Sequence, residues 1–471
     1  MNEAGTDDVA DRLRAWSAGR PLPRWSTRCI DLADDPFIVA LLRVGGEGRP
    51  SAIAYGKSSS SPLVLSVPDS REPRSVAEMV QTFGNHLLRE FPTDDSLSLR
   101  SQVLLPDRSH LELLHQMAYA YAFSKWPLAD MGLLNTVGRL LNSLFLQWQN
   151  PIQNNVVLAS DALQSLYIYP ASPARQGHLG FLLEWLVDHG SRLARHQSAM
   201  KAETRSVSTS LDGEFEDREI TDLLKTFEES NRSDHSVGNS LKKILEAEAL
   251  HRWHLSRAAF QTILQDPRPT NFGLRTLHAQ SRRAWSRLWV IPRQTELNGQ
   301  RAYWRGTETD MSATSAAEEM MLIELATQMK QEALSHGDWE IALSLVRRGK
   351  AIHGSVVTCR PQDGLLTVSY DNPDEVDFRE GTTYRPFGTA ELQVRYEDVD
   401  LVSRHVHFTV EKGALPFTSG DEILLIEYNP DFFVFNKIRN MSQQPTTGLD
   451  EVFRKPSSRP DTDTSPQDEV G

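Results

Sequence analysis

The chain has little cysteine and no long apolar run. Its two cysteines, Cys29 and Cys359, are too few for a disulfide scaffold or a cysteine-rich zinc module. No apolar run approaches the roughly 18 residues that a membrane-spanning helix needs. Residues 1–8 are acidic and polar, unlike a secretory signal. We therefore expect a cytoplasmic protein.

Basic residues are also fewer than acidic ones. The 471 residues include 63 Asp and Glu against 50 Lys and Arg, a formal net charge of -13. This balance excludes a protein that coats nucleic acid or an anionic membrane with its whole surface. The 24% of charged and 39% of hydrophobic residues are typical of a globular protein, which excludes wholesale disorder and collagen-like architecture.

Motifs of the common catalytic classes are missing. The nearest approach to a Walker A loop, at 51–58, lacks the first glycine, and Pro62 follows it where a helix would have to begin. The chain contains no Gly-x-Ser-x-Gly elbow, and no complete metal motif such as His-Glu-x-x-His. The sequence leaves an enzyme open but favours a non-enzymatic protein without a cofactor.

Hydrophobic periodicity predicts an α+β, multidomain chain. Residues 1–70 hold short strand-like runs between Gly-rich and Ser-rich turns, which predicts a small β meander. Residues 71–200 carry apolar residues at helical spacing, which predicts a helical domain. One helix start in this range is indicated by Ser109 and Glu112, which form a capping-box pattern.

The second half of the chain changes character twice. Residues 201–213 are polar and Ser/Thr-rich, which predicts a linker, and 214–349 return to helical spacing, which predicts a second helical domain. At 350–441 the period becomes 2, which predicts a six-stranded barrel or sandwich. Its expected strands are 351–359, 365–370, 389–397, 401–410, 421–428 and 432–438. The Pro/Ser/Thr/Asp-rich residues 442–471 predict a disordered tail.

Arginine is concentrated in one segment of this acidic chain. Residues 251–305 contain ten arginines, no lysine, two acids and four of the ten tryptophans, a net charge of +8. Arginine favours bidentate recognition of phosphate or carboxylate, and bases stack on arginine and aromatic side chains. We therefore predict a nucleic-acid or partner-binding face on a helix near 274–290. The residues proposed for it are Arg275, Arg282, Arg283, Arg287, Trp285 and Trp289.

Two other interpretations of the arginines stay open. Residues 212–229 hold eight acids and two bases, so they could pair with the arginines inside the fold. The protein would then be a scaffold that binds only proteins. In a third interpretation, the acidic stretch masks the arginine face until a partner displaces it.

A metal-dependent enzyme is the remaining alternative. Glu112 with His115, and Glu248 with His251, have the Glu-x-x-His spacing that helical di-iron proteins use. Because the two pairs fall in the two separate predicted helical domains, the sequence favours an interaction protein over a metal site at these residues.

The predicted C-terminal domain offers one resemblance. Residues 416–421, Pro-Phe-Thr-Ser-Gly-Asp, lead into the apolar run 423–426 and resemble a turn in the accessory barrels of UPF1-like helicases. Those enzymes use a Walker motor, which this chain lacks. The resemblance implies an adaptor or accessory subunit that works beside a helicase-type motor.

Overall fold

The computed structural model describes residues 7–25, 30, 32–44, 49–91, 102–122, 132–148, 155–210, 218–230, 234–266, 331–332, 334–371, 379, 381–389 and 391–428. The chain divides into two compact units. The first comprises Met1–Arg24 and Cys29–Ala317, and the second comprises Trp25–Arg28 and Glu318–Gly471. Both contain helices and a sheet, so the predicted α+β class is confirmed.

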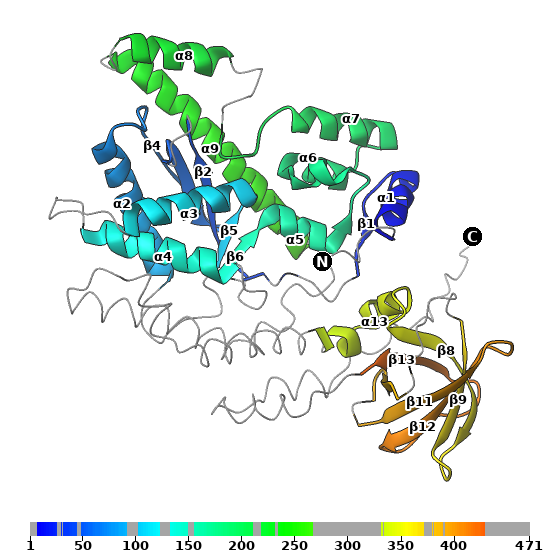
Figure 1. Ribbon diagram of the computed structural model, residues 1–471. Coiled ribbons are helices and arrows are strands. Elements are labelled where there is room, and N and C mark those ends of the chain that lie inside the picture. The colour runs from blue at the N-terminus through cyan, green and yellow to red at the C-terminus, as the bar shows by residue number, and fades with distance from the viewer. Residues whose placement is uncertain are drawn as a thin grey trace, which may run out of the picture. The chain divides into compact units, whose positions relative to one another are not determined.

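A five-stranded sheet forms the centre of the first unit, in the order β4-β3-β2-β5-β6 (Figure 1). Its strands are β2 Phe37–Leu42, β3 Ala52–Lys57, β4 Leu63–Ser66, β5 Val103–Leu105 and β6 Val156–Leu158. The first three form an antiparallel meander, and β5 and β6 add to it parallel to β2. Strands from both 1–70 and 71–200 thus share one sheet, where the sequence indicated a β region followed by a helical domain.

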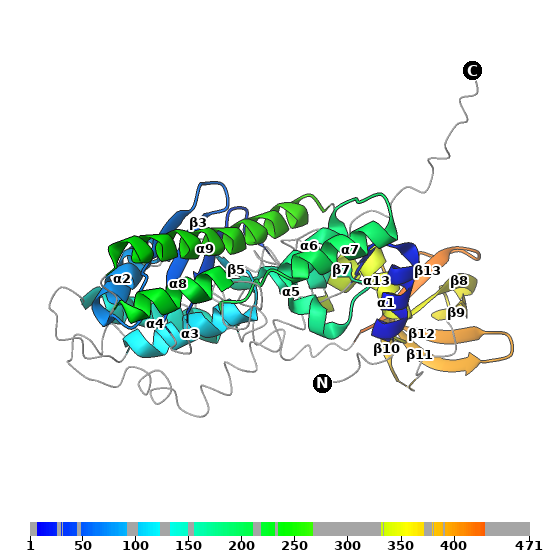
Figure 2. The ribbon, with the colours of Figure 1, turned by 90° about the horizontal axis from the view of Figure 1, so that it is seen from above.

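Helices cover both faces of this sheet. One face packs against α2 Pro73–Glu90, α3 Arg108–Ala122 and α4 Gly132–Trp148, and the other against α5 Ala159–Leu166, α6 Leu179–Leu186 and α9 His235–Leu264. Figure 2 shows α9 running across the strands and α3 and α4 lying side by side. Alternate residues of β2 enter the two cores, so this strand is apolar throughout and buried on both faces.

Smaller elements surround these layers. They are α1 Asp7–Ala18, β1 Leu22–Pro23, β7 Tyr167–Ile168, the 3₁₀ helix η2 Pro173–Gly177, α7 Arg192–Glu203 and α8 Arg218–Glu229. Strands β1 and β7 form a two-stranded antiparallel sheet, and α8 packs on α9. The acidic stretch of the sequence therefore includes an amphipathic helix attached to α9.

The second unit is a ring of six antiparallel strands, in the order β10-β11-β12-β9-β8-β13, closed by pairing of β13 with β10. Helix α13 Trp339–Val346 precedes the strands β8 Ala351–Arg360, β9 Leu365–Tyr370, β10 Thr383–Pro386, β11 Gln393–Asp400, β12 His405–Lys412 and β13 Glu422–Glu427. Inward side chains from all six strands form its core.

The observed ring includes one strand that the sequence did not predict. Five predicted strands overlap β8, β9, β11, β12 and β13, whereas β10 was not predicted. The four residues of β10 include an arginine and a proline, so they show no alternating apolar pattern. The predicted strand 432–438 and tail 442–471 lie outside the described residues.

Candidate functional site

The predicted arginine-tryptophan face lies outside the described residues. All six of its members, Arg275, Arg282, Arg283, Arg287, Trp285 and Trp289, follow α9 in the sequence, within residues 267–330. The described part of the arginine-rich segment belongs to α9. There Arg252 and Trp253 are fully buried, and Arg257 lies over the Trp253 ring at 5.6 Å. The segment thus begins inside the core rather than on a docking surface.

Polar residues gather where β2, β5 and β6 end. We call this region the carboxyl edge; the residues that follow the three strands there include Arg43, Asp107 and Asp161. In open α/β sheets, ligands usually bind outside the carboxyl ends of parallel strands. The carboxyl edge is therefore the candidate ligand-binding site of the first unit.

His110 fills the carboxyl edge beside β2. Strand β5 pairs with β2 only at Phe37 and Ile38, near the start of β2. It therefore offers no partner to the amide of Leu41, which lies further along β2. Instead that amide donates to Nδ1 of His110 at 2.9 Å, and Nε2 of His110 donates to the carbonyl of Val207 at 2.9 Å. Burial lowers the pKa of His110, which is fully buried, and both hydrogen bonds suit the neutral imidazole.

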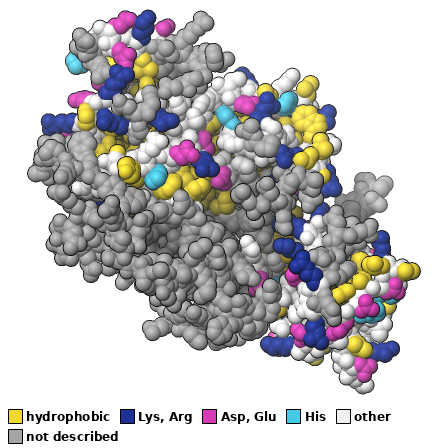
Figure 3. Space-filling view, viewed as in Figure 1, with side chains coloured by type: hydrophobic (Ala, Val, Ile, Leu, Met, Phe, Trp, Pro, Cys, Tyr) yellow, Lys and Arg dark blue, Asp and Glu magenta, His cyan; other side chains and the backbone are white. Residues whose placement is uncertain are grey.

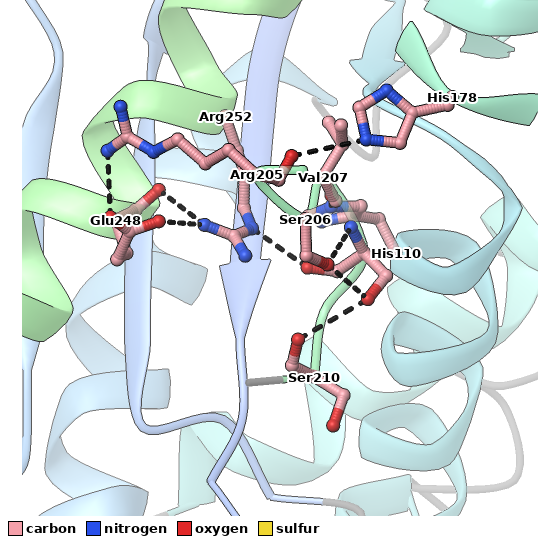
Figure 4. A network of polar contacts seen from close by, with 9 residues as sticks. His110, His178, Arg205, Ser206, Val207, Ser210, Glu248 and Arg252 are labelled. Atoms are coloured by element: carbon pink, nitrogen blue, oxygen red, sulfur yellow. Dashed lines mark hydrogen bonds and ion pairs between the residues drawn. The ribbon is translucent and has the colours of Figure 1, made fainter. Parts of the chain in front are cut away.

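Residues 204–210, which we call the strap, continue the sheet after β5 has ended (Figure 4). The Arg43 amide donates to the Thr209 carbonyl at 2.7 Å, and Arg43 and Ser210 form a parallel bridge. The Thr209 amide in turn donates to Oγ of Ser109 at 3.0 Å. Val207 and Thr209 are 1% and 2% exposed, so the strap is part of the core, although 201–213 was predicted to be a linker.

Two arginines and one carboxylate hold the outer side of the strap. Nε of Arg252 donates to the Ser208 carbonyl at 2.8 Å. Oε2 of Glu248 accepts from Arg252 at 2.7 Å, and Oε1 accepts from Arg205 at 2.7 Å. Burial alone would raise the pKa of Glu248, but the hydrogen bonds from Arg205 and Arg252 lower it. Nε2 of His178 contacts the Arg205 carbonyl at 3.1 Å and completes the network in Figure 4.

Two carboxylates follow neighbouring strands at the carboxyl edge. Oδ1 of Asp107 accepts from the amide and hydroxyl of Ser109 at 2.9 and 2.6 Å, and so caps α3. Burial raises the pKa of Asp161, and the charge of Asp107 raises it further. A carboxyl group of this kind can transfer a proton closer to neutral pH than an exposed one can. Its neighbour Asp107, however, already accepts the hydrogen bonds that cap α3.

The Glu-x-x-His pairs do not form a metal site in the described part of the chain. Glu112 accepts from Arg108 on the same helix, and His115 stacks on Phe145 at 3.7 Å between ring centroids. Glu248 is bound by its two arginines, as described above. Nowhere among the described residues do three or more His, Cys, Asp or Glu side chains gather as metal ligands would.

Sequence reasoning missed the residues that build the carboxyl edge. The capping-box pattern pointed to Ser109 as the first cap of α3, whereas Asp107 performs that role and Ser109 supports the strap. The strap itself alternates buried Val207 and Thr209 with less buried serines. This period of 2 was a readable strand signal, but its serines favoured a linker.

The face of the molecule seen in Figure 3 has charged side chains of both signs, with Lys and Arg interspersed among Asp and Glu. Within the described residues, no helix is both long enough and apolar enough to cross a bilayer.

Comparisons with protein-family models, curated proteins and solved structures give no significant match to this chain.

Proposed function

We propose that this chain is a cytoplasmic, non-enzymatic interaction protein in which the first unit serves as a rigid scaffold. The observation that carries this proposal is the filled carboxyl edge. His110 and the strap take the place beside β2, and their hydrogen bonds engage the polar groups they meet. A sheet edge closed by its own chain suits a structural role better than the binding of a substrate.

Nucleic acid is the first partner in this proposal, bound through Arg275, Arg282, Arg283, Arg287, Trp285 and Trp289. The support is the excess of arginine and tryptophan in a chain of net charge -13. Arg252 and Trp253 are excluded from the binding face, because both side chains are fully buried and cannot contact a partner. The binding residues would therefore come after α9.

The contacts of helix α8 also support this partner. Glu228 of α8 pairs with Arg71 at 3.0 Å, and Glu229 faces Lys225 one turn away at 3.9 Å. Glu228 and Glu229 of α8 thus have partners outside the arginine-rich segment. Buried Arg252 takes its carboxylate from Glu248 rather than from α8.

Filter binding with labelled single strands and duplexes across a salt series tests the proposal. Affinity should fall as salt rises, because bound phosphates release counterions. Substituting Arg282→Glu and Arg283→Glu together should abolish or strongly weaken binding. If each arginine neutralises one phosphate of a single strand, any residual slope of log affinity against log salt falls by about 1.4.

A matched control removes the same charge elsewhere. Arg14 and Arg74 are exposed at 63% and 72% of their side-chain surface, so Arg14→Glu with Arg74→Glu changes the net charge equally. Equal loss in both double variants would attribute binding to net charge alone and refute the arginine face. No binding by the unmodified protein would refute nucleic acid as the partner.

A purely protein-binding scaffold is the second candidate, favoured by helix α1. Val9, Leu13 and Trp16 lie on one stripe of α1 and are exposed at 50%, 61% and 38%. Figure 3 shows hydrophobic side chains near this end of the unit among Lys and Arg side chains. A helicase-type motor is the partner proposed for this case. Leu13→Asp should then abolish co-purification with such a partner and leave nucleic-acid binding unchanged.

A further inference from the structure

A buried arginine in the second unit lies on the outer face of the ring. Arg385 of β10 is opposite Ile426 of β13, and Ile426 packs with α13 outside the ring. The preceding residue, Tyr384, points into the ring core. Arg385 therefore lies between the sheet and the helical residues that cover it.

Arg385 is buried without a matching carboxylate. The residue is 9% exposed, and its guanidinium carbon lies 3.8 Å from the centroid of the Tyr428 ring. Its Nε is shielded from solvent and has no hydrogen-bond partner, and the residue forms no ion pair within the described part of the chain. A buried cation is costly unless an anion or hydrogen-bond acceptors compensate its charge.

A second unmatched group lies within electrostatic reach of Arg385. His336 precedes α13, and its Nδ1 is likewise shielded and without a hydrogen-bond partner. Burial and the charge of Arg385 lower the pKa of His336 to about 3, so its imidazole is neutral. One nitrogen of a neutral imidazole can donate a hydrogen bond.

An acid, Glu332, also interacts electrostatically with Arg385. Burial raises the pKa of Glu332 to about 7, with Arg385 opposing the shift. Burial thus favours the protonated carboxyl group, which adds a donor instead of a counter-ion. The cluster is therefore rich in donors and poor in negative charge.

We propose that Arg385, His336 and Tyr428 form a binding site for a small oxyanion, a phosphate or carboxylate group. The guanidinium Nε–H and its neighbouring N–H groups match the paired oxygens of such an anion, and His336 supplies a further donor. The ring of Tyr428 holds the guanidinium plane in place. Ionised Glu332 is the internal competitor of the bound anion.

Thermal unfolding of the full chain tests the site at pH 7 and constant ionic strength. Inorganic phosphate and acetate should each be compared with chloride, because a ligand that binds the native state raises the melting temperature. At least one of the two should raise it, and the stronger one identifies the anion class. Arg385→Gln should weaken this binding by about tenfold or more. A control variant, Arg395→Gln, removes an exposed arginine of β11 and should retain the full shift.

Two results would refute the proposed oxyanion site. No shift with either anion, or an equal shift in the unmodified protein and Arg385→Gln, would refute it. Should Arg385→Gln fail to fold, Glu332→Gln provides the test at pH 8, where ionised Glu332 competes. This variant should bind the anion several-fold more tightly than the unmodified protein, and unchanged binding would refute the proposal.

Discussion

Replacing His110 should destabilise the first unit far more than replacing another histidine of the same helix. His110→Ala leaves the Leu41 amide and the Val207 carbonyl without their partners, and both residues are buried. An orphaned buried group costs about 1–3 kcal/mol, so the two together predict a loss of about 2–6 kcal/mol. That is a large part of the roughly 5–15 kcal/mol by which a domain is stable.

Urea unfolding followed by circular dichroism measures this loss. His115→Ala is the control, because His115 is only partly buried and loses a ring stack worth about 1 kcal/mol. His110→Asn should recover part of the stability, since its side-chain oxygen lies near the Nδ1 position and can accept from Leu41. A loss below about 1 kcal/mol for His110→Ala, or no difference between the two His110 variants, would refute the bridging role.

His110 should also make the stability of the first unit depend on pH. Burial lowers the pKa of His110 from its ordinary 6.5, so the unfolded chain takes up a proton that the folded chain refuses. Stability is therefore lost as pH falls below about 6.5, by at most about 1.4 kcal/mol per pH unit. His110→Ala lacks this contribution, so its stability should fall less steeply between pH 6.5 and 5. Parallel slopes in the two proteins would contradict the assignment.

Three further substitutions test other contacts by urea unfolding. Gly138→Ala places a Cβ 2.3 Å from the backbone nitrogen of Ala122, so α3 and α4 must move apart. This should cost about 1–3 kcal/mol of stability. Unchanged stability would contradict the close approach of the two helices. Glu248→Gln leaves fully buried Arg252 without its carboxylate and should cost about 3–5 kcal/mol, whereas a loss below 1 kcal/mol would mean that the network is solvated. Asp400→Ala removes an exposed acceptor from two turn amides of the β11–β12 hairpin and should leave the unfolding midpoint nearly unchanged. Unfolding of the whole ring would contradict this local role.

Local patterns in the sequence were enough to find most elements of the ring. Strands β8, β9 and β12 alternate buried and more exposed residues along much of their length, which a period of 2 reveals. Strand β10 has no such pattern, yet it pairs with β11 on one side and β13 on the other. Its place in the ring depends on those two neighbours rather than on its own residues.

The extent of the first unit was harder to predict. Strands β5 and β6 have three residues each, which is too short for a periodic signal among long helices. Their parallel pairing beside β2 joins residues from both sides of the boundary expected near residue 70. The predicted meander and the predicted helical domain therefore belong to one layered unit.

The sequence by itself determined the α+β class, the helical stretches, most ring strands and the uneven distribution of charge, because these depend on neighbouring residues. Only the tertiary structure decided what His110, Ser109 and the strap do. His110 joins Leu41, 69 positions before it, to Val207, 97 positions after it, and Thr209 meets Ser109 across 100 positions. The partners of these groups are set by where β5 ends beside β2, and no local spacing encodes that end.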